Sequence, residues 1–216
     1  GSVGQKFIEL LANHPWFEIS ELCASDKSAG KKYKDAVDWF LPSPLPESVG
    51  EILVQKCEPI LKSKVVFSGL DSNAKAGYKV ISNSKNHRMD NDVPLLIPEV
   101  NPDHLELIRT QSYGEGCIVT NPNCSVIGLV IALKPLLDNF GLESVNVVTM
   151  QAISGAGHPR VVKLDIEDNV IPFIKGEEPK VEAEPLKILG KLNTNQILYN
   201  DFKISAQCNR VKVTDG

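Results

Sequence analysis

The chain has 216 residues, of which 42% are hydrophobic and 23% charged, and its formal net charge is −4. These values are ordinary for a globular protein of one or two domains, and they exclude a disordered or collagen-like chain. The slight acidity argues against nucleic acid and anionic membranes as partners. Five scattered cysteines are an odd number, which excludes a secreted disulfide framework and favours a reducing, cytoplasmic location.

The first half of the sequence predicts alternating helices and strands. Apolar residues at positions 3, 7, 10 and 11 have the spacing of one helix face. A further helix is predicted over 102–110, with Asn101 as its cap and with Leu105 and Ile108 on one face. Short β-rich runs predict strands at 17–25, 64–67, 78–82 and 116–120. Strands that alternate with helices indicate an α/β fold with a parallel sheet.

The pattern changes after residue 124, which indicates a second domain. A long helix is predicted over 125–140, followed by a strand at 144–150, a Glu- and Lys-rich helix at 180–189 and a strand at 202–211. We therefore divide the chain into domains at 1–123 and 124–216, with the boundary near Asn121-Pro122-Asn123.

The two ends of the sequence lead to a further expectation. A glycine turn at 1–4 runs directly into a helix, and such a turn usually follows a strand. Asp215-Gly216 is a turn signal at the end of an alternating segment. We therefore expect a first strand upstream of Gly1 and further residues downstream of Gly216.

Cys124 stands at a predicted strand–helix junction. Asn123 is a good N-cap residue, which makes Cys124 the first residue of the helix. At that position the helix dipole favours a thiolate, and the free amides of the first turn can stabilise an oxyanion. An acyl-transfer nucleophile needs both. One such junction is a weak signal on its own, since most free cysteines are small buried hydrophobic residues.

Seven segments of distinctive sequence occur in order along nearly the whole chain. They are GSVG at 1–4, ASDKSAGK at 24–31, SNSKNHRMD at 82–90, VPLLIPEVN at 93–101, NPNCS at 121–125, QAISGAG at 151–157 and CNRV at 208–211. Together they resemble the aspartate-β-semialdehyde dehydrogenase family, in the branch found in archaea and fungi. Seven ordered motifs are far more specific than a lone glycine-rich turn.

This resemblance implies a Rossmann-like NADP-binding domain over 1–123 and an α+β catalytic and dimerisation domain with a mixed sheet over 124–216. It implies NADPH-dependent reductive dephosphorylation of L-4-aspartyl phosphate to L-aspartate 4-semialdehyde, in the biosynthesis of lysine, threonine, methionine and isoleucine. Cys124 matches the nucleophile, which forms an acyl-thioester and expels phosphate before hydride transfer. Gln151 matches the glutamine that orients the substrate. A homodimer or homotetramer is expected.

The resemblance also assigns the substrate-binding residues. Arg210 matches the arginine that holds the substrate α-carboxylate, for which a planar guanidinium is well suited. Arg88 and Lys180 match the phosphate site, and Glu177 then faces the substrate ammonium. Asn123 contributes to the phosphate or oxyanion site. Without the resemblance, Arg210 could equally be a solvated strand charge, and the segment from Glu177 to Lys180 a solvated helix start.

The family's general acid/base is a histidine seven residues after the arginine of Cys-Asn-Arg. Counting from Arg210 places it one position beyond Gly216, and none of the four histidines of the sequence fits that role.

The cofactor is expected to be NADP. Ser25, Lys27 and Ser28 lie where the 2′-phosphate of adenosine is bound, although Asp26 stands where NAD-selecting enzymes often place a carboxylate. The other expected cofactor contacts are small or glycine residues in turns: Gly1, Ser2, Val3, Gly4, Ser68, Gly69, Ser154, Gly155 and Gly157.

Other functions stay open at this point. Malonyl-CoA reductase and N-acetyl-glutamyl-phosphate reductase share the fold and the cysteine chemistry, although the sequences around Cys124 and Arg210 favour the amino-acid enzyme. A non-catalytic nucleotide-binding module is the alternative from a different class. No metal is expected, because Cys117, Cys124 and a distant histidine match no standard zinc spacing.

Overall fold

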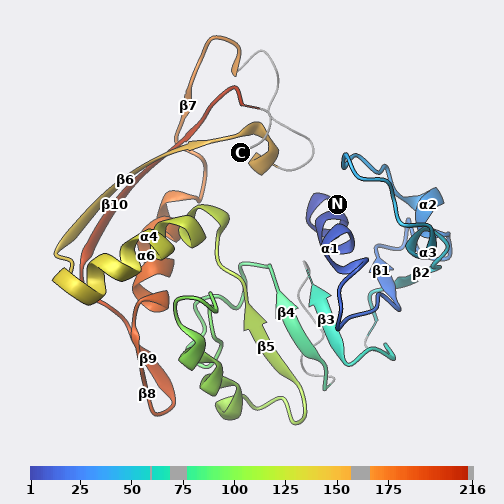
Figure 1. Ribbon diagram of the computed structural model, residues 1–216, viewed down its shortest axis with the longest axis horizontal. Helices are drawn as coiled ribbons and strands as arrows, with labels where there is room; N and C mark the ends of the chain where they lie inside the picture. The colour runs from blue at the N-terminus through green and yellow to red at the C-terminus, as the bar shows by residue number, and fades with distance from the viewer. Residues whose placement is uncertain (59, 69–76, 157–165, 214–216) are drawn as a thin grey trace.

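The computed structural model describes residues 1–216 except 59, 69–76, 157–165 and 214–216 (Figure 1). It begins with the helix α1 (Ser2–Leu11), which the apolar spacing predicted. A small parallel sheet of β1 (Leu22–Ala24) and β2 (Val54–Lys56) follows, and the short helices α2 (Tyr33–Ala36) and α3 (Glu47–Gly50) lie between its strands in sequence.

The central sheet of the first half is parallel, as predicted. Its strands β3 (Val65–Ser68), β4 (Lys79–Ser82) and β5 (Cys117–Thr120) pair in that order. The ring of Phe7 in α1 lies 5.4 Å from the ring of Phe67 in β3, so α1 packs against this sheet. This contact holds the middle of α1 against β3.

The strand predicted over 17–25 is wrong in length, because only Leu22–Ala24 is a strand. Just before it, the carboxylate of Glu21 accepts hydrogen bonds from the backbone amides of Lys62 and Ser63. The amides of Lys62 and Ser63 are therefore bonded to a side chain. In a longer sheet they would have bonded to backbone carbonyls of a neighbouring strand.

The helix predicted over 102–110 has the predicted bounds but is the 3₁₀ helix η2 (Pro102–Thr110). Its buried residues are His104 and Leu107, whereas Leu105, on the predicted apolar face, is exposed and Ile108 is half-buried. The three-residue interval fits a 3₁₀ helix, in which residues i and i+3 lie above one another. Asn101 does not cap this helix through its side chain, which instead bonds backbone groups at 95 and 97.

The second half is built on a mixed sheet of β6 (Ser144–Gln151), β10 (Lys203–Arg210) and the short β7 (Ile171–Pro172). The strands β6 and β10 are parallel over their whole length, and β7 is antiparallel to β10. The other elements that the structure describes in this half are α4 (Cys124–Phe140), η3 (Ile153–Ala156), α6 (Glu178–Ile188) and the hairpin β8 (Lys191–Asn193) and β9 (Gln196–Leu198).

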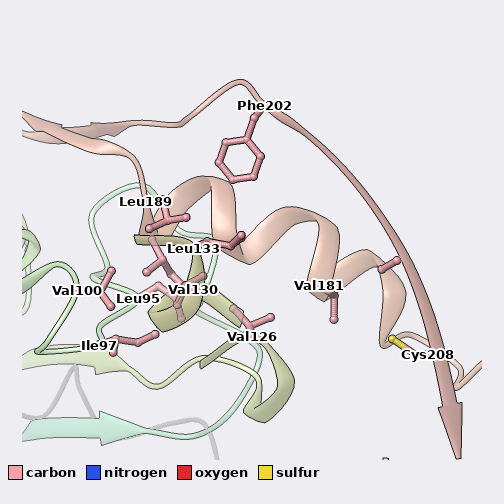
Figure 2. Packing of buried hydrophobic residues seen from close by; sticks show 12 residues of the cluster. Leu95, Ile97, Val100, Val126, Val130, Leu133, Val181, Leu189, Phe202 and Cys208 are labelled. Atoms are coloured by element: carbon pink, nitrogen blue, oxygen red, sulfur yellow. The ribbon is translucent and has the colours of Figure 1, made fainter. Parts of the chain in front are cut away.

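One hydrophobic cluster joins α4, α6 and β10 (Figure 2). Val126 and Val130 of α4 and Val181 of α6 are fully buried in it. Leu95, Ile97 and Val100 from the loop before η2 belong to the same cluster. This loop, which we placed in the first domain, is therefore packed directly on the helix that begins at Cys124. The boundary at residue 123 stays a prediction.

Candidate active site

Cys124 is the first residue of α4, and the N-cap is Asn123, as predicted. The Oδ1 of Asn123 accepts a hydrogen bond of 3.0 Å from the Ser125 amide. The thiol of Cys124 is exposed, whereas Cys117 and Cys208 are buried. The alternative interpretation of Cys124 as a small buried hydrophobic residue is therefore wrong. Exposure at a helix N-terminus leaves the sulfur accessible to a substrate beside the positive end of the helix dipole.

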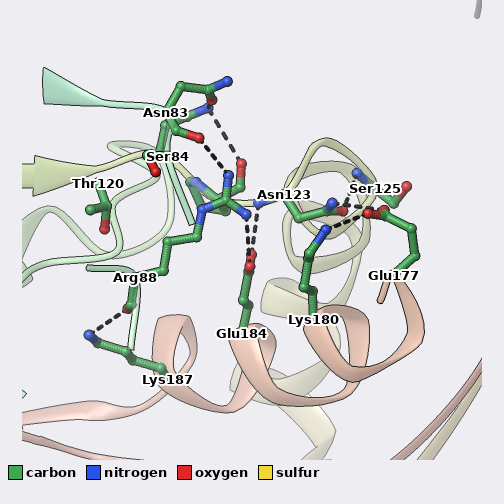
Figure 3. Close-up of polar contacts among 12 residues, drawn as sticks. Asn83, Ser84, Arg88, Thr120, Asn123, Ser125, Glu177, Lys180, Glu184 and Lys187 are labelled. Atoms are coloured by element: carbon green, nitrogen blue, oxygen red, sulfur yellow. Dashed lines mark hydrogen bonds and ion pairs between the residues drawn. The ribbon is translucent and has the colours of Figure 1, made fainter. Parts of the chain in front are cut away.

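The side chain of Asn123 also connects α4 to the start of α6. Its Nδ2 donates to Glu177 Oε2 over 2.9 Å, and Lys180 Nζ lies 2.6 Å from Glu177 Oε1 (Figure 3). Burial works to raise the pKa of Glu177, but the hydrogen bonds from Lys180 and Asn123 and the charges of Lys180 and Arg210 outweigh it. The pKa of Glu177 is therefore lowered, and the carboxylate is ionised at neutral pH. The Lys180 and Glu177 side chains are 29% and 13% exposed, which argues against the alternative of a solvated helix start.

Arg88 is connected to the backbone of Asn123 through the carboxylate of Glu184. Its side chain is only 8% exposed; Nη1 is 2.9 Å from Glu184 Oε1, and Nη2 donates to the Asn83 carbonyl over 3.0 Å. The second oxygen of Glu184 accepts the backbone amide of Asn123 at 2.7 Å (Figure 3). Among the buried side-chain polar atoms of the described residues, Arg88 Nε is the one without a hydrogen-bond partner.

Lys187 holds the backbone of the loop that carries Arg88. Its side chain is fully buried, and Nζ donates to the carbonyls of Arg88, Asp90 and Val93 over 2.7–2.8 Å. Burial lowers the pKa of Lys187 to about 8, against the opposing attraction of Asp90 and Asp92. The loop is thereby attached to α6 at three points.

Glu184 and Lys187 were not predicted as site residues. A signal for them was present, since positions 177, 180, 184 and 187 have the i, i+3, i+7, i+10 spacing of one helix face. A polar stripe of this kind is usually solvated, but here it is packed against the Arg88 loop and the Cys124 junction.

Gln151 and Arg210 are register partners at the carboxyl ends of β6 and β10. Gln151 Nε2 lies 3.2 Å from Thr149 Oγ1. Arg210 is 5% exposed, and its Nη1 donates to the Ala152 carbonyl over 2.6 Å. The alternative of a solvated strand charge is therefore wrong for Arg210. The positive charge of Arg210 also contributes to the lowered pKa of Glu177.

The residues predicted to bind the cofactor lie at element ends. Gly1 precedes α1, whose first turn, including Ser2, Val3 and Gly4, has no side-chain cap. Methyl groups added at Gly1 or Gly4 would meet no atom within 4 Å, so the backbone there is open. Ser68 ends β3, and Ser154 and Gly155 are in η3. Gly69 and Gly157 lie outside the described residues.

The loop after β1 carries the predicted 2′-phosphate residues. Ser25 and Ser28 close a turn through a 2.9 Å backbone hydrogen bond, and Lys27 is exposed within it. The Asp26 carboxylate lies 3.6 Å from Lys56 Nζ, so a lysine of β2 offsets its charge. Acidic and basic groups are therefore both present at this turn.

Within the described residues, no helix is both long and apolar enough to cross a membrane. In the same part of the chain, no group of three or more His, Cys, Asp or Glu side chains is arranged to hold a metal ion.

Comparison with known proteins identifies two matching family models. One describes the NAD-binding domain of semialdehyde dehydrogenases and matches residues 1–108; the other describes their dimerisation domain and matches residues 133–216. These matches, with the parallel and mixed sheets, confirm the predicted Rossmann-like α/β fold class.

Curated relatives and solved structures agree with these models. Aspartate-semialdehyde dehydrogenases from Archaeoglobus fulgidus and Saccharomyces cerevisiae are 52% and 46% identical over the whole chain, which spans 66% of the length of each. The crystal structure of the Candida albicans enzyme with NADP has a TM-score of 0.91 at 45% identity, and the chain covers 66% of it. Aspartate semialdehyde dehydrogenase II from Vibrio cholerae has a TM-score of 0.73 at 29% identity, with 99% of this chain and 68% of that chain covered. The resemblance that the seven motifs predicted is therefore confirmed, and the chain belongs to the aspartate-semialdehyde dehydrogenase family.

Proposed function

We propose that the protein is an NADP-dependent aspartate-semialdehyde dehydrogenase that converts L-4-aspartyl phosphate to L-aspartate 4-semialdehyde and inorganic phosphate. The observation that carries this proposal is the exposed thiol of Cys124 at the start of α4, surrounded by a network that contains Arg88 and Lys180. A nucleophile and two cations suit an acyl phosphate, whose leaving group is a phosphate anion.

Cys124 has the role of nucleophile in this proposal. Its sulfur attacks the acyl carbon, a carbon–sulfur bond forms, and the bond to the phosphate oxygen breaks, so that phosphate leaves with the electron pair. The amides of the first turn of α4 stabilise the negative charge that develops on the carbonyl oxygen. Asn123 fixes this turn through its contact with the Ser125 amide.

Arg88 and Lys180 have the role of holding the phosphate. The Nε of Arg88 is a buried donor without a partner among the described residues, and a donor of that kind is costly unless an acceptor arrives. A phosphate oxygen supplies this acceptor. Lys180 contributes a second positive charge, which the ionised Glu177 balances when phosphate is absent.

Arg210 and Glu177 have the role of binding the amino-acid group. The guanidinium of Arg210 matches a carboxylate, and the ionised carboxylate of Glu177 matches an ammonium. The two groups lie close enough for Arg210 to lower the pKa of Glu177. Gln151, the register partner of Arg210, then orients the acyl group between them and Cys124.

The cofactor site fits a dinucleotide phosphate. An uncapped helix start with open glycines is suited to a pyrophosphate, because its free amides can approach closely. Lys27, in the turn that Ser25 and Ser28 close, supplies a positive charge for a 2′-phosphate. When bound, NADPH supplies the hydride that reduces the thioester. Ser68, Ser154 and Gly155 are further contacts by this proposal, as are Gly69 and Gly157.

Assembly and location complete the proposal. The match to a dimerisation domain supports a homodimer. A homotetramer is the alternative assembly in this proposal. We place the enzyme in the cytoplasm, because its free cysteines suit a reducing compartment.

The test is turnover by the full-length protein. With aspartate semialdehyde, inorganic phosphate and NADP, we expect NADPH to form only when all three are present. Malonate semialdehyde with coenzyme A and N-acetyl-glutamate semialdehyde with phosphate test the two related reductases. Turnover with either of these in place of aspartate semialdehyde would contradict the proposal. No turnover, together with no single reactive thiol at Cys124, would indicate a nucleotide-binding module.

A further inference from the structure

A single buried carboxylate connects two parts of the site that are far apart in sequence. The Glu184 side chain is 3% exposed; its Oε1 lies 2.9 Å from Arg88 Nη1, and its Oε2 lies 2.7 Å from the backbone nitrogen of Asn123 (Figure 3). Both oxygens are therefore in use, one on the arginine of the proposed phosphate site and one on the residue that caps the helix of Cys124.

The helix that carries Glu184 is itself firmly placed. Glu178 and Glu182 on α6 accept the backbone amides of Cys208 and Ala206 in β10. One turn after Glu184, Lys187 holds the carbonyl of Arg88 over 2.8 Å. The guanidinium and the backbone of Arg88 are thus both fixed by the same helix, at two points one turn apart.

A buried ion pair is not a clear source of stability, because the desolvation of both charges offsets much of their attraction. The Glu184–Arg88 pair does determine where the guanidinium lies, and the contact with Asn123 extends this control to the start of α4. The third guanidinium nitrogen of Arg88, Nε, is then oriented by groups that are themselves buried.

We propose that Glu184 is a positioning residue, which sets the place of the phosphate-binding Arg88 relative to the helix start that bears Cys124. The inference rests on the proposed function, since it deepens the role given there to Arg88. Glu184 itself has no free oxygen for substrate, so it acts through Arg88 and Asn123.

The first test is the isosteric variant Glu184→Gln, assayed in the full-length protein. An amide can accept from only one of the two donors and presents its NH2 group to the other. We expect kcat for phosphate-dependent oxidation to fall at least tenfold, while KM for aspartate semialdehyde, which Arg210 determines, stays within twofold. The matched control is Glu182→Gln on the same helix, which keeps an acceptor for the Ala206 amide and should retain wild-type kcat.

Two alternative roles of Glu184 give different results. A purely electrostatic role predicts a lower KM for phosphate with unchanged kcat, because Arg88 loses its neutralising partner. A merely structural role predicts a lower Tm with both kinetic constants unchanged in the folded fraction. Either result would overturn the proposal. If Glu184→Gln does not fold, Glu184→Asp keeps the charge but is one methylene shorter, and kcat should fall at least fivefold.

A double-mutant cycle tests whether Glu184 acts through Arg88. In an Arg88→Met background, Glu184→Gln should change kcat/KM less than threefold, against at least tenfold in the wild type. Equal effects in both backgrounds would contradict the positioning role. Failure of the proposed function can be distinguished from failure of the positioning role, because it would appear as absent turnover in the wild-type protein itself.

Discussion

Gly155 lies directly against the guanidinium of Arg210, and a methyl group at Gly155 would be 2.9 Å from Nη1. Such a distance is below van der Waals contact, so one of the two groups must move. Arg210 Nη1 is held by the Ala152 carbonyl at 2.6 Å, in the same short segment that contains Gly155. The glycine therefore determines where the arginine can lie.

We expect Gly155→Ala to displace the Arg210 guanidinium and to weaken the binding of the substrate carboxylate. KM for aspartate semialdehyde should rise about tenfold, the equivalent of about 1.4 kcal/mol, with a smaller change in KM for phosphate. Steady-state kinetics with each substrate varied in turn would measure both. Gly128→Ala is the control, since its added methyl meets no atom within 4 Å. Equal increases in the two KM values would contradict the role of Gly155.

The Cys124→Ala variant should lose phosphate-dependent oxidation of aspartate semialdehyde. Covalent catalysis is absent without the sulfur, so the expected loss in kcat is about a thousandfold or more. Cys23→Ala is the matched control, because this thiol is also exposed but lies in β1. Retention of more than about a thousandth of the wild-type rate in Cys124→Ala would refute the assignment.

The position of Cys124 at a capped helix start was predictable because its determinants are local. Asn123 caps the helix that begins at Cys124, and the apolar pattern of α4 places that helix start correctly. The parallel sheet followed equally from short β-rich runs. These features depend on residues within a few positions of one another, and one sequence contains that information.

The buried part of the site was not predictable in the same way. Glu184 and Lys187 look like ordinary residues of a Glu- and Lys-rich helix, and their partners are 61 to 99 positions away. Their burial follows from the packing of the loop at 88–93 on α6. The prediction of a strand over 17–25 was wrong in length for a related reason, since the Glu21 side chain bonds Ser63, 42 positions away.

Lys27 should favour NADPH over NADH. Its ammonium attracts the 2′-phosphate, so Lys27→Glu should repel it and shift the ratio of kcat/KM for the two cofactors toward NADH by about tenfold or more. Lys31→Glu tests the effect of charge alone, because it reverses an exposed lysine just after the same turn. Equal kcat/KM values for NADPH and NADH in the wild type would contradict the assignment, as would equal shifts in the two variants.

Lys187 should give the protein a distinctive dependence of stability on pH. Burial lowers its pKa from 10.5 to about 8 in the folded chain. At pH values between these two pKa values the unfolded chain binds more protons than the folded chain, so the free energy of unfolding rises with pH. For this group alone the rise between pH 7 and pH 9.5 is about 2 kcal/mol.

The measurement is the difference in unfolding free energy between the wild type and Lys187→Met, obtained by denaturant titration at several pH values. At neutral pH the variant should be less stable by about 3 kcal/mol, because three backbone carbonyls lose their donor. The difference should widen by about 2 kcal/mol toward pH 9.5, since only the wild type contains the group that titrates. Lys191→Met, which removes an exposed lysine, should show neither effect. A difference between wild type and Lys187→Met that is constant with pH would mean that Lys187 keeps its ordinary pKa, and that its charge is not buried beneath the Arg88 loop.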